Sequence, residues 1–168
     1  MKITDFFLDE LRREAERSKR ALELVPDGKF DWKPHDRSMA FGYIAMMVAT
    51  IPDWIVMEIN QAELDIAPKD GGGKRPDPPR TSAALLRELD RAVAAATDAL
   101  KKTTDAHLET NWRLLAGGQV VWEGTRREII SDTFLHLAHH RGQMTVYLRL
   151  MGATVPALFG PSADDKRF

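Results

Sequence analysis

The chain has 168 residues, of which 29% are charged, and a formal net charge of -1 at pH 7. This length suits one domain with its own hydrophobic core, and the near-zero net charge lacks the basic excess that attracts nucleic acid. Because cysteine is absent, disulfides, thiolate catalysis and cysteine-based zinc sites are excluded. No stretch has the apolar pattern of a signal peptide or a membrane span, so we expect a cytoplasmic protein without nucleic-acid or membrane partners.

Apolar residues at helical spacing predict two long helices in the first part of the chain. The first covers residues 5–25, with Thr4 as its expected N-cap and Pro26-Asp27-Gly28 as its end. The second covers residues 40–63 after a candidate cap at Ser38. This second helix is nearly apolar on all sides, as in a buried helix, and we expect Pro52 to kink it.

Glycine and proline interrupt the helical pattern over residues 67–80. This composition predicts a flexible surface loop that crosses between helices. Its run Gly71-Gly72-Gly73-Lys74 does not match a phosphate-binding loop, because no strand precedes it and no Ser or Thr follows the lysine. Thr81 or Ser82 then caps a third helix, which is predicted to run to about Lys102.

The last third of the chain predicts a hairpin, a fourth helix and an irregular tail. Two short apolar runs surround Gly117-Gly118 between residues 108 and 124, a pattern typical of a β-hairpin. The helical period returns over residues 125–151 and stops at Gly152. Four long helices that must bury their apolar stripes predict an all-α four-helix bundle with one long crossover loop, and residues 155–164 are expected to lie over it.

Histidines cluster in the fourth predicted helix, in the run His136-Leu-Ala-His139-His140-Arg141-Gly142-Gln143. At about 100° of rotation per residue, His136 and His140 share one helix face and could chelate one ion. A catalytic zinc or nickel site normally takes three protein ligands, so hydrogen-bonded core histidines are the alternative. His139 is expected in a second shell or an interface, while Arg141 and Gln143 either orient the histidines or serve the structure.

Five short motifs follow one another along nearly the whole chain. They are Trp32-Lys-Pro-His35-Asp-Arg-Ser38-Met39, Ile51-Pro52-Asp53-Trp54, Gly117-Gly118, the histidine run and Gly160-Pro161-Ser162-Ala163-Asp164. With these motifs in this order, the chain resembles the DinB family of four-helix metalloproteins, also called DinB/YfiT-like. The resemblance implies a bundle that binds a divalent metal, often zinc or nickel, through one histidine on the second helix and two on the fourth, here His136 and His140.

Met47 stands where the resemblance places the histidine of the second helix, seven residues before Trp54. A thioether is a soft, neutral ligand that suits zinc or nickel poorly, so this departure predicts a weakened or abandoned metal site. Tyr43 and Thr50 lie about one turn on either side of Met47. We expect both to line the same pocket, with core packing as the alternative for Tyr43.

Two functions remain open at this point. The resemblance implies a divalent-metal-dependent enzyme of the thiol-transferase type, which acts on a small molecule with a low-molecular-weight thiol and forms a homodimer. In such an enzyme the metal would lower the pKa of a bound thiol or water and so create a nucleophile. The alternative, favoured by Met47, is a non-catalytic small-molecule-binding or protein-interaction module that has lost the metal.

Overall fold

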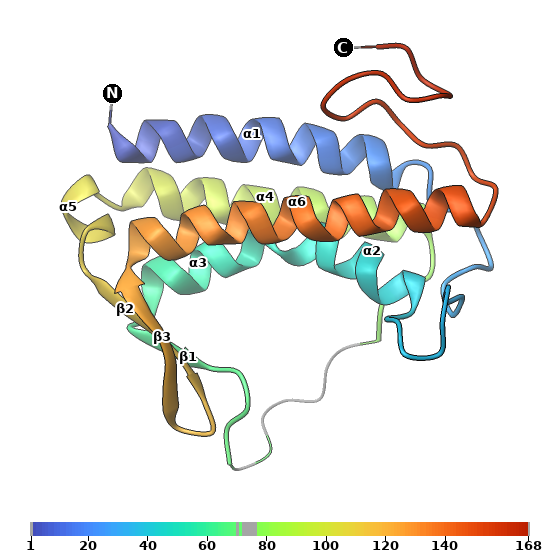
Figure 1. The fold of residues 1–168 in the computed structure, drawn as a ribbon. Helices are drawn as coiled ribbons and strands as arrows, with labels where there is room; N and C mark the ends of the chain where they lie inside the picture. Colours follow the sequence, from blue (N-terminus) through green and yellow to red (C-terminus); the bar gives the residue numbers. More distant parts are fainter. Residues whose placement is uncertain (1, 70, 72–76, 168) are drawn as a thin grey trace.

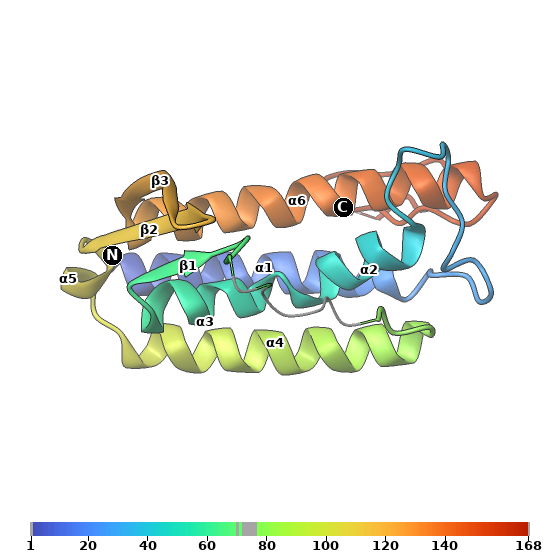
Figure 2. The ribbon, with the colours of Figure 1, turned by 90° about the horizontal axis from the view of Figure 1, so that it is seen from below.

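Four helical rods run side by side in the computed structural model, which describes residues 2–69, 71 and 77–167 (Figures 1 and 2). They are α1 (Ile3–Leu22), the bent pair α2 (Phe41–Thr50) and α3 (Pro52–Asn60), α4 (Ser82–Lys102) and α6 (Arg126–Leu150), with a short α5 (Asp105–Leu108) after α4. The predicted helical bundle is therefore confirmed. Residues 70 and 72–76 of the predicted crossover loop lie outside the described residues.

Proline divides the second predicted helix where the sequence indicated. The axes of α2 and α3 differ by 50°, and Pro52 occupies the first turn of α3, where its missing N–H costs nothing. Two details of the prediction were wrong. The N-cap is Ala40 rather than Ser38, and the helix ends at Asn60, after which the chain turns into a strand.

A small sheet covers one end of the bundle (Figures 1 and 2). The predicted hairpin is confirmed as β2 (Asn111–Ala116) and β3 (Gln119–Thr125), joined at Gly117 and Gly118, both with positive φ. The third strand, β1 (Glu63–Asp65), pairs in parallel with β2 and was not predicted. Its Asp65 carboxylate accepts hydrogen bonds from the Gly117 and Gly118 N–H groups at 3.0 and 2.7 Å, so β1 also fixes the hairpin turn.

The predicted cap of α4 is confirmed, the predicted cap of α1 is wrong, and α6 has a cap that was not predicted. Thr81 accepts from the Ala84 N–H, and Thr125 forms a reciprocal capping box with Glu128. Thr4, the predicted cap of α1, instead lies inside the first turn. The start of α1 is capped from a distance, because the Asp105 carboxylate accepts from the N–H groups of residues 3 and 4 at 3.0 Å each.

Buried apolar side chains fill the bundle along its length. One group lies around α2 and the C-terminal part of α6, and another around α3 and the N-terminal part of α6. They include Phe41, Ile44, Leu89 and Leu148 in the first group and Phe7, Leu11, Ile55 and Ile130 in the second. Among the described residues no single helix is long and apolar enough to cross a membrane; only α2 and α3 taken together, across their bend, reach that length and composition.

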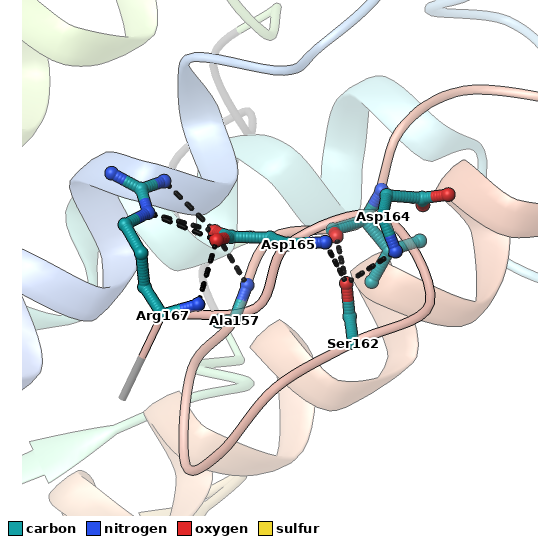
Figure 3. Close-up of polar contacts among 6 residues, drawn as sticks. Ala157, Ser162, Asp164, Asp165 and Arg167 are labelled. Atoms are coloured by element: carbon teal, nitrogen blue, oxygen red, sulfur yellow. Dashed lines mark hydrogen bonds and ion pairs between the residues drawn. The ribbon is translucent and has the colours of Figure 1, made fainter.

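The C-terminal tail is irregular, as predicted, and polar contacts hold it in place (Figure 3). The Ser162 hydroxyl accepts from the N–H groups of Asp164 and Asp165 at 3.0 Å each, and Asp165 in turn accepts from the Ala157 N–H at 3.1 Å. Hydrogen bonds from the Arg167 side chain and from the backbone N–H groups of Ala157 and Arg167 hold the pKa of Asp165 far below its usual range. The tail also meets α1, where the Arg17 guanidinium lies 4.2 Å from the Phe159 ring centre.

Candidate functional site

The two histidines that share a helix face converge in the structure. His136 Nε2 and His140 Nε2 lie 2.9 Å apart on α6. The other ring nitrogen of His140, Nδ1, lies 2.9 Å from Gln143 Oε1. Because a carbonyl oxygen only accepts, this contact assigns the proton of His140 to Nδ1. His140 Nε2 therefore accepts the hydrogen bond that His136 Nε2–H donates. A metal-bound histidine is oriented in the same way, by a partner that accepts from its second nitrogen.

Desolvation favours the uncharged form of both imidazoles, although only His140 is buried, at 6% exposure, and His136 is exposed on one side. It lowers the pKa of His136 and of His140, and the proximity of His139 lowers both further. For His140 the hydrogen bond with Gln143 opposes this effect without cancelling it. Both rings are therefore neutral at pH 7, as a metal ligand must be.

Aromatic contacts position the pair. The Trp54 ring of α3 meets His136 edge-on, with ring centres 4.9 Å apart. His139 is exposed, and its ring centre lies 5.2 Å from that of His140 and 6.4 Å from that of His136. The structure thus joins His136, His139, His140 and Gln143 into one cluster, with Trp54 packed against it.

Three predicted pocket residues of α2 make different contacts. Met47 and Tyr43 are half-buried and pack against the core group around α2, and the Thr50 hydroxyl donates to the Met46 carbonyl at 2.9 Å. None of the three lines the cavity described below. Their contact with a ligand stays a prediction.

The histidine pair supplies two donors of a metal site. Its converging Nε2 atoms, neutral rings and oriented His140 fit a divalent ion that takes its other ligands from water or substrate. Within residues 2–69, 71 and 77–167, no group of three His, Cys, Asp or Glu side chains is placed to hold a metal. The pair alone would therefore hold an ion less tightly than a three-ligand site.

A cavity of about 250 Å³ adjoins His136, between α3, α6 and the sheet. Its wall is mostly apolar and contains two tryptophan rings, Trp54 and Trp112. Besides His136, the polar side chains on the wall are those of Glu58, Asp132 and Thr133. The remaining wall residues are Met57, Leu64, Ile66, Leu114 and Ile129.

Glu58 is a buried acid on this wall, with only 4% of its surface exposed. Its Oε1 accepts a hydrogen bond of 2.6 Å from the Thr133 hydroxyl, while its Oε2 has no hydrogen-bond partner among the described residues. Burial raises the pKa of Glu58 to about 8, helped by the nearby charge of Asp132 and opposed by the Thr133 hydrogen bond. Glu58 is therefore mostly protonated at pH 7.

Trp112 carries a second unsatisfied polar atom on the same wall. The ring is 2% exposed, and its Nε1–H finds no acceptor among the described residues. Neither Glu58 nor Trp112 was singled out from the sequence. A signal for Glu58 was present, because it is the one charged residue in the apolar stretch from Trp54 to Ile59 of α3.

Arg141, the remaining polar candidate of the histidine run, is structural. Its guanidinium is fully buried against α1, where it donates to Glu14 Oε2 at 2.5 Å and to the Ser18 hydroxyl at 3.2 Å. It therefore points away from His136 and His140 toward another helix. Of the two possible roles of this arginine, the structure shows the one that joins helices.

Comparison with known proteins places this site in a family. The family model described as "DinB family" matches residues 1–166. A protein of Bacillus subtilis named uncharacterized protein YrdA is 27% identical over 163 residues, which cover 96% of this chain and 90% of the relative.

Solved structures share the fold. A DinB-like protein from Bacillus cereus superposes with a TM-score of 0.69 at 23% identity, over 91% of this chain and 95% of the other. YfiT from Bacillus subtilis superposes with a TM-score of 0.62 at 17% identity, over 89% and 87% of the two chains. YfiT is described as a probable metal-dependent hydrolase with an unusual four-helix bundle topology.

Proposed function

The chain belongs to the DinB family, and on this premise we propose that it is a divalent-metal-dependent enzyme of the thiol-transferase type. The observation that carries the proposal is the convergence of two neutral imidazoles, with Nε2 atoms 2.9 Å apart, beside an apolar cavity. Zinc or nickel held by His136 and His140 would act as a Lewis acid that lowers the pKa of a bound thiol or water. The description of YfiT as a probable metal-dependent hydrolase supports the metal dependence of this proposal, although hydrolysis uses water in place of a thiol.

Residues of the chain give the site its specificity in this proposal. Gln143 holds His140 with its Nε2 lone pair toward His136, and Trp54 packs against the His136 ring. The apolar wall of the cavity would take the electrophilic small molecule and exclude water from it. A low-molecular-weight thiol would then give its proton to solvent and attack the electrophilic carbon at the end of the cavity formed by His136. A C–S bond would form as the bond to the leaving group, a halide in the test below, breaks.

Met47 favours a second candidate function. A module that binds a small molecule or a protein and has lost the metal would keep the cavity without a third metal ligand, and Met47 stands where that ligand is expected. The two candidates differ in metal content. The homodimeric assembly and the cytoplasmic location stay predictions in either case.

Metal titration of Met47 variants tests the placement of the third ligand. We expect Met47→His to bind Zn²⁺ or Ni²⁺ at least about tenfold more tightly than the wild type in calorimetry, because an imidazole replaces a poor donor. Met47→Leu is the matched control and should leave the affinity unchanged. Equal affinities for all three proteins would contradict this position of Met47 beside the metal.

Thiol transfer provides the functional readout. We expect metal-loaded protein to accelerate the loss of an aryl halide electrophile in the presence of glutathione or cysteine, and we expect His136→Ala/His140→Ala to abolish that acceleration. If water is the nucleophile, the same metal-dependent loss would occur without thiol. A rate that is independent of the histidines would favour the non-catalytic module.

A further inference from the structure

Beyond the class of chemistry, the cavity wall indicates what kind of molecule it holds. We propose that the cavity between α3, α6 and the sheet binds an uncharged molecule of about one substituted ring, through a polar group that accepts hydrogen bonds. That this molecule is the substrate rests on the proposed function. The binding itself rests only on the wall of the cavity.

Two buried atoms without partners define the polar part of the ligand. Glu58 Oε2 and Trp112 Nε1–H both belong to residues of the wall, and neither has a hydrogen-bond partner within the described part of the chain. A buried polar atom without a partner costs stability, so such atoms are uncommon in folded proteins. The indole N–H needs an acceptor. The Oε2–H of protonated Glu58 needs one too, because Oε1 already accepts from Thr133. The oxygen of a hydroxyl or amide group is such an acceptor.

Size limits the rest of the ligand. A dry, apolar cavity of about 150 Å³ accommodates benzene, whereas sites for drug-sized molecules start at about 300 Å³. The cavity of about 250 Å³ lies between these limits. Its two tryptophans, Trp54 and Trp112, and its aliphatic side chains suit one ring with a small substituent.

Charge on the wall favours a neutral molecule. The wall includes the acids Glu58 and Asp132, while no lysine or arginine among the described residues contributes to it. An anion would therefore enter without a counter-ion. Glu58 is mostly protonated at pH 7, since burial raises its pKa to about 8, and so offers a cation no full negative charge. The other acid, Asp132, is exposed to solvent, which screens its charge.

Four probes of similar shape test this inference: benzyl alcohol, toluene, benzylamine and benzoate. We would titrate each into chelator-treated protein and follow the four tryptophan indole N–H signals by NMR. We expect benzyl alcohol to bind about tenfold more tightly than toluene and to shift the Trp112 signal. Tighter binding of benzylamine or benzoate, or no binding of any probe, would overturn the proposal.

Paired variants separate the two polar contacts from general packing. Trp112→Phe and Glu58→Met should each weaken benzyl alcohol binding by about tenfold and leave toluene binding nearly unchanged, because each removes one hydrogen-bonding partner. Trp122→Phe is the matched control for the ring, since Trp122 packs 6.3 Å from Trp112 and does not line the cavity. Thr103→Val is the control for the loss of an unpartnered buried oxygen elsewhere.

A cavity-filling variant covers the case in which a polar variant does not fold. Ile129→Phe adds volume at a half-buried position of the wall and should abolish binding of benzyl alcohol and toluene alike. Unchanged binding in this variant would show that the probes do not bind in this cavity. Binding of the probes to the metal-free wild type supports the inference even if the protein takes up no metal. The test of the cavity and the test of the proposed function can therefore fail independently.

Discussion

Burial sets the charge of the side chains around the cavity. Removal from water disfavours the charged form of any group, so it raises the pKa of Glu58 to about 8 and lowers those of His136 and His140. At pH 7 the site therefore presents two neutral bases and one neutral acid. A neutral imidazole binds a metal ion, and a neutral carboxyl group donates a hydrogen bond.

The protonation of Glu58 makes stability depend on pH. Its pKa is about 8 in the folded chain and 4.5 in the unfolded chain, so the folded state holds its proton more tightly. The contribution of Glu58 to the free energy of unfolding is complete below about pH 4.5. It is lost as the pH rises toward about 8, by at most about 1.4 kcal/mol per pH unit. We expect Glu58→Gln, which keeps the Thr133 hydrogen bond, to lose this part of the pH dependence in urea unfolding.

Glu16→Gln, a change of an exposed acid on α1, is the control for that experiment. Its unfolding free energy should follow the wild type across the whole pH range. If Glu58→Gln also runs parallel to the wild type between pH 5 and 8, Glu58 is ionised in the folded protein and the account of its burial is wrong.

Spacing in the sequence predicted the histidine pair but not the acid beside it. The four-residue interval between His136 and His140 fixes their relative position on any helix, and the structure confirms their convergence. The environment of Glu58 depends on Thr133, 75 residues away along the chain, and on the sheet. Such neighbours cannot be deduced from a local pattern.

At the scale of helices and strands, local signals again explain what was predictable. The cap at Thr81 and the break at Pro52 depend on residues within one turn of the boundary. The cap of α1 comes from Asp105, and β1 exists because it pairs with β2, about 50 residues later. Both features require the tertiary structure, which is why the sequence did not indicate them.

Removal of the distant cap tests its contribution. We expect Asp105→Ala to lower the midpoint of thermal unfolding by about 2–4 °C, the shift typical of losing one helix cap in a chain of this length. The physical reason is that the N–H groups of residues 3 and 4 lose their acceptor. Asp9→Ala, at an exposed position of α1, should leave the midpoint nearly unchanged; equal shifts in both variants would contradict the cap.

Across the whole molecule, a buried ion pair joins α1 to α6. Arg141 and Glu14 are 1% and 4% exposed and lie 2.5 Å apart, and Arg17 makes a second contact with Glu14. The sequence predicted that these helices pack together, because each has an apolar stripe. It did not predict the cavity, which is the space left after every element has packed.

A double-mutant series measures the energy of this pair. We expect Glu14→Met to lower the free energy of unfolding by about 3–5 kcal/mol, because it leaves the Arg141 charge buried without its partner. Glu14→Met/Arg141→Met should recover much of that loss. Glu109→Met breaks an exposed ion pair with Arg127 and should cost less than about 1 kcal/mol; a similar loss in Glu14→Met would contradict the buried pair.

The metal content of the purified protein tests the central claim most directly. Untagged wild type and His136→Ala/His140→Ala would be incubated with zinc or nickel, passed through a desalting column and measured by elemental analysis. The account predicts about one metal ion per chain in the wild type and none in the double variant. Metal absent from both proteins, or retained equally by both, would contradict a metal centre at His136 and His140.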